Sequence, residues 1–224
     1  MTEPENTNQD AIAFWENRYQ ERPQIWSGKA NAALVAVASS LIPGRALDLG
    51  SGEGGDSIWL AEQGWTVTGI DISTTALARA AEHAASRSNQ AHGAGRELVA
   101  AISWQQADLA EWQPTEEFDL VSACFLHSPV AFPREEVLRR AAQAVAPGGH
   151  LLVVGHASFP SAHQPHHDEP PLPTPDEVVE SLQLAEGWTT VLSETRSREA
   201  TGPDGQPMVL DDAIVLVRRA AGVA

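Results

Sequence analysis

Cysteine is almost missing from this chain of 224 residues, which has only one, Cys124. A single cysteine excludes an internal disulfide framework and a cysteine-based zinc knuckle. The sequence also has no uninterrupted apolar stretch near the length of about 18 residues that a membrane-spanning helix needs, so we expect no membrane partner. Its first ten residues are polar and acidic, without the basic-then-apolar order of a secretory signal, which predicts a cytoplasmic protein.

Basic residues are scarce as well, because 14 Lys and Arg stand against 30 Asp and Glu, giving a formal net charge of −16. A surface of that sign repels the phosphates of nucleic acids and of anionic membranes, so we expect no nucleic-acid partner. The length suits one α/β domain with a sizeable core. Composition leaves the oligomeric state open between a monomer and a homodimer.

Three segments are expected along the chain. Residues 1–9 have no apolar anchor beyond the initiating methionine and predict a disordered leader. In residues 10–44, apolar side chains recur at helical spacing after Asp10, which is expected as the N-cap, and this pattern predicts a helical cap or lid. Residues 45–224 alternate apolar runs with helical patterns and predict the main domain.

Strand and helix patterns alternate five times, which predicts an α/β fold with a parallel sheet and helices on both faces. The last two strand-like runs flank residues 202–205 (GPDG), a hairpin signature, so an antiparallel end is expected. The polar segment Ser88–Arg96 predicts a surface loop. The strands are expected at residues 45–49, 65–70, 101–105, 118–125, 150–155, 189–200 and 208–218, and the helices at 30–40, 56–63, 73–86, 135–145 and 174–187.

The first strand leads directly into a glycine turn, residues 50–55 (GSGEGG). Glycines at such a turn allow positive φ angles and close approach of a ligand, and the following helix presents free N–H groups. The spacing of Gly50, Gly52 and Gly54 satisfies the adenosylmethionine pattern, and the same run satisfies the dinucleotide pattern G-x-G-x-x-G. Asp71 lies 19 positions after Gly52 and is placed to hold ribose hydroxyls in both cases.

Two further carboxylates favour an adenosine ligand with a zwitterionic end. Asp48 precedes the first glycine, where a carboxylate repels a pyrophosphate and attracts an ammonium group. Asp108, after the third strand, is placed to accept a hydrogen bond from an adenine amino group. The terminal hairpin is also foreign to the usual nicotinamide domain. These features favour S-adenosyl-L-methionine as the cofactor and S-adenosyl-L-homocysteine as its product.

The run ALDLGSGEGGDSIWLAEQGWTVTGIDIS, followed by Asp108, FDLVSACFLH and APGGHLLVVGH, resembles the class I S-adenosylmethionine-dependent methyltransferases. The resemblance begins near Arg45 and implies a Rossmann-like seven-stranded sheet of order 3-2-1-4-5-7-6 with strand 7 antiparallel. It also implies cofactor-binding residues at the methionine end (Asp48, Gly50, Gly52, Gly54), the ribose (Asp71), the adenine (Ile72, Asp108, Leu109) and beneath the sulfonium (Cys124, Phe125, His127).

The N-terminal stretch FWENRYQERPQIWSGKAN is similar to that of thiopurine- and tellurite-resistance-type small-molecule methyltransferases. In those families a tryptophan-bearing segment before the first strand closes over the cofactor. The matching positions are Trp15, Tyr19 and Trp26, which the similarity implies as cofactor-binding lid residues. The alternative for these aromatic side chains is that they only anchor the start of the chain.

Two histidines, His127 and His156, follow the fourth and fifth strands, at the edge where open α/β sheets bind ligands. Each is a candidate for contact with the methyl acceptor or for general-base catalysis, and each can instead be a structural histidine. Direct in-line displacement at a methyl carbon depends mainly on alignment and on exclusion of water. A base is therefore needed only for an acceptor that must lose a proton.

The His/Pro-rich connection, residues 156–173, exceeds ordinary loop lengths beside this edge and predicts a lid over the substrate. Its histidines and acidic residues are of types that ligate zinc or nickel. The prolines among them leave no helix to present neighbouring histidines on one face, so we expect no metal site.

The segment Ala123–Pro129 limits the acceptor class. It departs from the Asp/Asn-Pro-Pro-aromatic signature of enzymes that methylate amino groups of bases or of protein glutamine, and Cys124 does not follow a proline as a cytosine-C5 nucleophile does. The sequence therefore predicts a methyltransferase for a small-molecule thiol, chalcogen or hydroxyl. An NAD(P)-dependent oxidoreductase and a non-catalytic adenosine-ligand binding module would use the same glycine turn.

Overall fold

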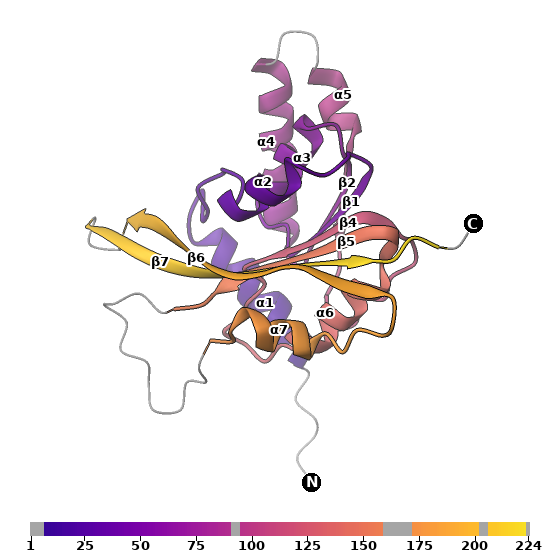
Figure 1. The fold of residues 1–224 in the computed structure, drawn as a ribbon. Helices are drawn as coiled ribbons and strands as arrows, with labels where there is room; N and C mark the ends of the chain where they lie inside the picture. The colour runs from indigo at the N-terminus through magenta and orange to yellow at the C-terminus, as the bar shows by residue number, and fades with distance from the viewer. Residues whose placement is uncertain (1–6, 91–94, 159–171, 202–205, 223–224) are drawn as a thin grey trace, which may run out of the picture.

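The computed structural model describes residues 7–90, 95–158, 172–201 and 206–222, which form one seven-stranded sheet with helices on both faces (Figure 1). The strand order is β3-β2-β1-β4-β5-β7-β6, and β7 is antiparallel to both of its neighbours. This topology confirms the predicted sheet order and the antiparallel seventh strand. The strands are β1 (Arg45–Leu49), β2 (Thr66–Asp71), β3 (Ile102–Gln106), β4 (Phe118–Cys124), β5 (Val145–His156), β6 (Trp188–Thr201) and β7 (Pro207–Arg219).

The helices form two layers, with α2, α3, α4 and α5 on one side of the sheet and α6 and α7 on the other, while α1 packs against the start of α4 (Figure 1). Ser73 begins α4 as expected, because its Oγ accepts a hydrogen bond from the Ala76 N–H at 3.1 Å. A capping box of Thr174 and Glu177 begins α7. The helices are α1 (Thr7–Gln20), α2 (Ala32–Ala38), α3 (Gly55–Glu62), α4 (Thr74–Gln90), α5 (Gly95–Ala100), α6 (Arg134–Gln143) and α7 (Pro175–Ser181).

The segment between α4 and β3 differs from the sequence-based expectation. α4 continues to Gln90 and α5 begins at Gly95, so the surface loop expected at Ser88–Arg96 is helical at both of its described ends. The physical reason is Leu98, which is buried in the core cluster under α3 and β2 and draws this segment back against the sheet. Residues 91–94 lie outside the described ranges.

Three other boundaries also differ. α1 begins at Thr7, so Asp10 lies in its first turn and is not the N-cap, and residues 1–6 of the expected leader lie outside the described ranges. β5 begins at Val145, before the expected start at His150, because Val145 is buried and pairs with Phe118 ahead of a register shift. α7 ends at Ser181 instead of Gly187, as the chain turns away at Gln183 with φ 50°.

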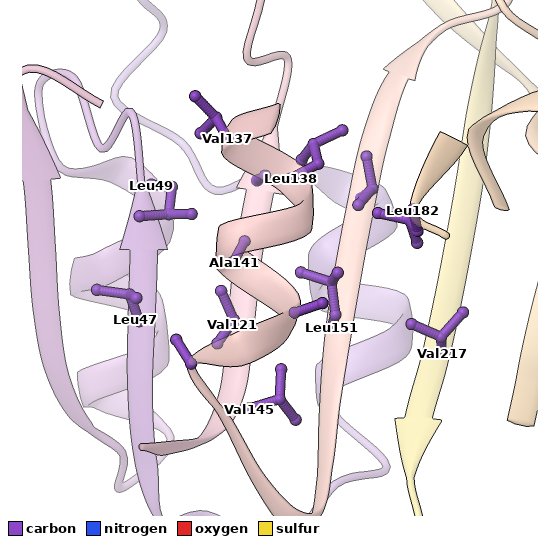
Figure 2. Packing of buried hydrophobic residues seen from close by; sticks show 14 of the residues in the cluster. Leu47, Leu49, Val121, Val137, Leu138, Ala141, Val145, Leu151, Leu182 and Val217 are labelled. Carbon is purple, nitrogen blue, oxygen red and sulfur yellow. The ribbon is translucent and has the colours of Figure 1, made fainter. Parts of the chain in front are cut away.

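The core lies on both faces of the sheet, as expected for strands covered by helices on both sides. Figure 2 shows one of the two clusters, in which Val137, Leu138 and Ala141 of α6 pack against β1, β4 and β5. The other cluster joins α2, α3 and α4 to the opposite face. None of the helices in the described part of the chain is long and apolar enough to cross a membrane. The two packed faces hold the carboxyl ends of the parallel strands along one edge.

Replacing Leu138 with alanine tests the α6 contribution to this core. Leu138 is 0% exposed, so Leu138→Ala is expected to lower the free energy of unfolding by about 2–5 kcal/mol, measured by urea denaturation. Val99→Ala is the matched control, because Val99 is a helical residue that is 47% exposed, and it should change the free energy by less than about 1 kcal/mol. Equal losses in the two variants would contradict this view of the core.

Candidate functional site

A cavity of about 1120 Å³ lies at the carboxyl ends of β1, β2, β4 and β5. Open α/β sheets bind ligands at this edge, on either side of the point where the strand order reverses. Here the reversal falls between β1 and β4. The expected site residues that line the cavity are Trp15, Tyr19, Trp26, Asp48, Gly50, Gly52, Asp71, Ile72, Asp108, Leu109, Cys124, Phe125, His127 and His156.

The glycine turn begins the cavity at the end of β1. Gly50 and Gly52 have φ angles of 72° and 53°, which side chains rarely allow. A Cβ on Gly52 would lie 3.1 Å from the Tyr19 hydroxyl and 3.3 Å from Trp26 Nε1, so glycine also makes room for the aromatic residues of the cap. Both glycines therefore allow the bend of the chain, and Gly52 also allows the close approach of the cap.

Gly54 is not among the residues that line the cavity, although the sequence assigned it to the cofactor. A Cβ at this position would lie 2.8 Å from the Ala80 Cβ and 2.8 Å from the ring of Trp104. Gly54 also has a φ angle of 85° as the N-cap of α3. The packing of α3 against α4 and β3 therefore accounts for a glycine here, and the contact with the cofactor stays a prediction.

The turn uses its own N–H groups internally. Those of Gly50 and Ser51 both donate to the Ile70 carbonyl, at 2.8 and 2.9 Å, and the N–H of Gly54 donates to Ser51. The N–H of Gly52 donates to Asp71 Oδ2 at 2.8 Å. Asp71 Oδ1 accepts from the Ser73 N–H at 2.9 Å, so this carboxylate joins the turn to the end of β2 and the start of α4. Few donors are left for an anion.

Several carboxylates are buried around the same turn. Asp48 accepts hydrogen bonds from Ser57 Oγ at 2.7 Å and from Ser122 Oγ at 3.2 Å. Burial, and then the charge of Asp56, raises the pKa of Asp48 well above its usual range. Burial likewise raises the pKa of Asp71 to about 6. A cationic group of a ligand would therefore relieve the concentration of negative charge at this turn.

The cap is fastened over the turn by Glu53, a residue that the sequence analysis did not single out. Its side chain is 1% exposed and accepts hydrogen bonds from the N–H groups of Ile25 at 3.1 Å and Trp26 at 3.0 Å. Arg79 of α4 pairs with the same carboxylate at 2.9 Å. The sequence signal was an acidic residue between two glycines of a turn that was expected to be buried against a ligand, where a charged side chain needs a partner.

Two other contacts hold the cap. The Trp26 indole N–H donates to the hydroxyl of Tyr19 at 3.0 Å, which joins the end of the cap to α1. Glu16 of α1 accepts hydrogen bonds from the hydroxyls of Thr74 at 2.9 Å and Thr75 at 2.6 Å, at the start of α4. Tyr19 and Trp26 therefore lie at the cavity as a hydrogen-bonded pair, and Trp15 lies there beside Tyr19, with ring centroids 6.3 Å apart.

The adenine-side candidates lie together at the ends of β2 and β3. Ile72, Asp108 and Leu109 all line the cavity. One oxygen of Asp108 accepts a hydrogen bond from the Ala110 N–H at 2.8 Å, which leaves its second oxygen for a ligand. This arrangement suits an aromatic base between an aliphatic side chain and an acceptor.

The far end of the cavity is mostly apolar, with two histidines. Phe125, Leu126 and Phe132 line it beside His127 and His156. The two imidazole rings are stacked with centroids 5.9 Å apart, and the ring of Phe125 lies 4.5 Å from that of His156. Phe125 has a φ angle of 51°, an uncommon conformation that directs the chain across the end of the sheet.

Two candidate reactive groups have perturbed ionisation here. Burial, together with the charge of Arg134, lowers the pKa of His127 to about 4, so its imidazole is neutral at physiological pH. Burial raises the pKa of the Cys124 thiol, and the nearby carboxylates of Asp56 and Asp48 raise it further. Cys124 is therefore an unreactive thiol at neutral pH.

No group of three or more potential metal ligands occurs in the described part of the chain. Most of the His/Pro-rich connection, residues 159–171, lies outside that part, so the expected lid over the substrate is not described. His156 at its start is part of β5 and lines the cavity.

Comparisons with known proteins point to one family. Residues 46–149 match the model of a methyltransferase domain. Thiocyanate methyltransferase 1 of Arabidopsis thaliana is 36% identical over 110 residues, which are 48% of this chain and 44% of that protein. Probable thiol methyltransferase 2 of the same plant is 28% identical over 151 residues, which are 66% of this chain and 63% of that protein. The chain thus spans about half the length of these relatives.

A solved structure is similar over nearly the whole chain. Its description concerns the conversion of a disulfide bond into a thioacetal group during echinomycin biosynthesis. It is 25% identical, covers 95% of this chain and 93% of its own, and has a TM-score of 0.69. Because 95% of this chain is covered, the similarity extends beyond the sheet to most of the cap, which precedes β1.

The buried acids predict a specific dependence of stability on pH. Asp48 holds its proton to higher pH in the folded chain than in the unfolded chain, so its contribution to stability is lost as the pH rises from about 4 through its raised pKa. Asp48→Asn removes this dependence. The free energy of unfolding, measured by urea denaturation, should therefore rise in the variant relative to the wild type by at least about 1.4 kcal/mol between pH 5 and pH 8.

Asp10→Asn, in the exposed first turn of α1, is the control for the change in net charge. Its difference from the wild type should stay the same at both pH values. A difference for Asp48→Asn that is also independent of pH would contradict the raised pKa.

Proposed function

We propose that the chain transfers the methyl group of S-adenosyl-L-methionine to a small sulfur nucleophile, as a member of the class I S-adenosylmethionine-dependent methyltransferases. Its residues 46–149 match a methyltransferase domain, and its sheet has the order that the resemblance to this class implies. The proposal rests on one observation above all. The glycine turn keeps its own N–H groups occupied and is surrounded by buried carboxylates. Such a turn suits an ammonium group and disfavours a diphosphate.

In this proposal the parts of the cavity divide the cofactor between them. Asp48 and the glycine turn hold the aminoacyl end, Asp71 the ribose hydroxyls, and Ile72, Asp108 and Leu109 the adenine. S-adenosyl-L-methionine supplies an electrophilic methyl carbon on a positively charged sulfur. The chain binds the two reactants in line, and the cap with Trp26 excludes water from between them.

The acceptor class follows from the far end of the cavity. Phe125, Leu126 and Phe132 offer a mainly apolar surface, which a polarizable sulfur nucleophile tolerates better than a strongly hydrated one. The names of the two plant relatives, for thiocyanate and for thiols, support the same class. We therefore propose a thiol or a thiocyanate-like anion as the acceptor.

Binding of S-adenosyl-L-homocysteine tests the cofactor assignment against the oxidoreductase alternative. Calorimetry should show S-adenosyl-L-homocysteine binding to the wild type at least about tenfold more tightly than NADH. Asp71→Asn should weaken the binding of S-adenosyl-L-homocysteine by about 10- to 100-fold, because a hydrogen bond to a charged group contributes about 1.5–3 kcal/mol. Tighter binding of NADH would reject the proposal.

Asp71 also holds the turn, so the variant needs a structural control. Leu138→Ala lowers stability in the α6 core, which does not line the cavity, and it should change the affinity little. If Leu138→Ala weakened binding as much as Asp71→Asn, the ribose assignment would be wrong. A chain that binds S-adenosyl-L-homocysteine but methylates neither thiocyanate nor alkyl thiols would instead favour the non-catalytic binding module.

The fastening of the cap gives a further prediction. Glu53→Gln keeps one acceptor oxygen but loses the charge that pairs with Arg79, so the N–H groups of Ile25 and Trp26 are held less firmly. Hydrogen exchange at these two amides should become at least about tenfold faster, and the affinity for S-adenosyl-L-homocysteine should fall by a similar factor. Glu62→Gln, at the end of α3, is the matched control, because it breaks an exposed pair with Arg87. Unchanged exchange in Glu53→Gln would show that Glu53 does not hold the cap.

A further inference from the structure

Two unpartnered polar atoms face one another at the far end of the cavity. His156 Nδ1 and Asp212 Oδ1 are both buried, and neither has a hydrogen-bond partner in the described ranges of the chain. They lie 3.7 Å apart, and the Asp212 side chain is 5% exposed. Buried polar atoms are normally satisfied, and a small movement of the imidazole would satisfy both. Catalytic hydrogen bonds are often long before a substrate binds.

The position of Asp212 follows from the sheet. His156 on β5 and Asp212 on β7 are directly opposite in the antiparallel register, so their side chains share one face. Arg198 of β6 donates from Nε to Asp212 Oδ2 at 2.6 Å. The guanidinium also lies over the ring of Phe125, 5.5 Å from its centroid. Asp212 is therefore held from behind, with its second oxygen directed at His156.

His156 presents its other edge to the cavity. Its side chain is 39% exposed and lines the cavity, while Nδ1 is buried. The exposed part of the ring lies away from Nδ1, and we infer that Nε2 is the nitrogen that meets the cavity. A carboxylate next to Nδ1 favours the tautomer with the proton on Nδ1, which leaves the lone pair of Nε2 free to accept a proton.

His127 is not equivalent to His156. Its Nε2 is buried and lies against β5, 3.2 Å from where a Cβ on Gly155 would be. Arg134, which donates to the Leu126 carbonyl at 3.1 Å, adds a positive charge beside it. Burial and this charge make His127 a poor proton acceptor, and its ring packs against that of His156.

We propose that His156 is the general base for the methyl acceptor and that Asp212 is the residue that positions it. The inference rests on the proposed methyl transfer. The proton of an S–H acceptor passes to Nε2 of His156, and the lone pair of that sulfur forms the new bond to the methyl carbon. The bond from the methyl carbon to the sulfonium breaks with its electron pair on the leaving sulfur. The proton on His156 then leaves to solvent.

The charged and titratable groups around His156 come from every neighbouring element. They are Asp212 on β7, Arg198 and Glu199 on β6, His127 after β4, and Arg134 on α6. Arg198 is already paired with Asp212, so it orients the carboxylate more than it opposes a charge on His156. A base is needed only for a protonated acceptor, so thiocyanate, which carries no proton to remove, should bypass His156.

The tautomer of His156 tests the pair without any acceptor. Nitrogen-15 NMR of the full chain at pH 8, with the signal assigned by its loss in His156→Gln, should show the proton on Nδ1 in the wild type. In Asp212→Asn the preference for this tautomer should be lost. A wild-type ring protonated on Nε2, or an unchanged tautomer in Asp212→Asn, would overturn the proposal.

Rates with two probes test the catalytic consequence. With 2-mercaptoethanol as the acceptor, Asp212→Asn and His156→Gln should each lower kcat by at least about tenfold at pH 7. With thiocyanate, both should stay within about threefold of the wild type. Asp211→Asn is the matched control on β7, since its carboxylate bonds to Ser197 away from the histidines, and it should leave both rates unchanged. Equal losses with the two probes would mean a merely structural role and would overturn the proposal.

The two inferences fail in different ways. If the wild type does not bind S-adenosyl-L-homocysteine, the proposed methyl transfer fails, whatever the tautomer of His156. If the wild type binds it and methylates thiocyanate, but Asp212→Asn loses no rate with 2-mercaptoethanol, only the general-base assignment fails.

Discussion

The carboxylate of Asp71 is the contact on which the site depends. It accepts from the N–H of Gly52 and from that of Ser73, so it joins the glycine turn, the end of β2 and the start of α4 in one unit. Because this carboxylate is buried, its two hydrogen bonds are worth more than they would be in water, and an unpartnered N–H in their place would be costly. The proposed contact with the ribose would add a function to a residue that already holds these elements together.

Buried carboxylates then determine which ligand the turn accepts. Glu53 fastens the cap through the backbone of Ile25 and Trp26, and Asp48 lies between two serine hydroxyls at the mouth of β1. The cost of burying these carboxylates is offset by hydrogen-bond donors within the protein, so few donors remain for an anionic ligand. A buried carboxylate is also paired within the protein at the far end of the cavity, where Asp212 pairs with Arg198 and has its other oxygen toward His156. The buried carboxylates therefore hold the cap and the strands together, and in our proposal that of Asp212 also orients the imidazole of His156.

Patterns local in sequence predicted most of the fold. Alternating apolar and helical patterns predicted the parallel sheet, and the hairpin glycines predicted its antiparallel end. The strand order came from the resemblance to the class I methyltransferases, and most of the expected residues do line one cavity. What the sequence could not give depends on contacts distant along the chain. Gly54 needs the approach of Ala80 and Trp104 to explain it, α5 forms because Leu98 is buried, and Asp212 meets His156 only through the register of β5 and β7. Strand partners of that kind are set by tertiary packing, which no short window of residues contains.

A crystal structure of the chain with S-adenosyl-L-homocysteine tests the central claim most directly. We expect the aminoacyl group in the glycine turn beside Asp48, the ribose hydroxyls on Asp71, and the sulfur directed toward Phe125 and His156 beneath a closed Trp26. Density for the nucleoside at any other edge of the sheet, or a diphosphate bound across the turn when NADH is soaked in its place, would contradict it.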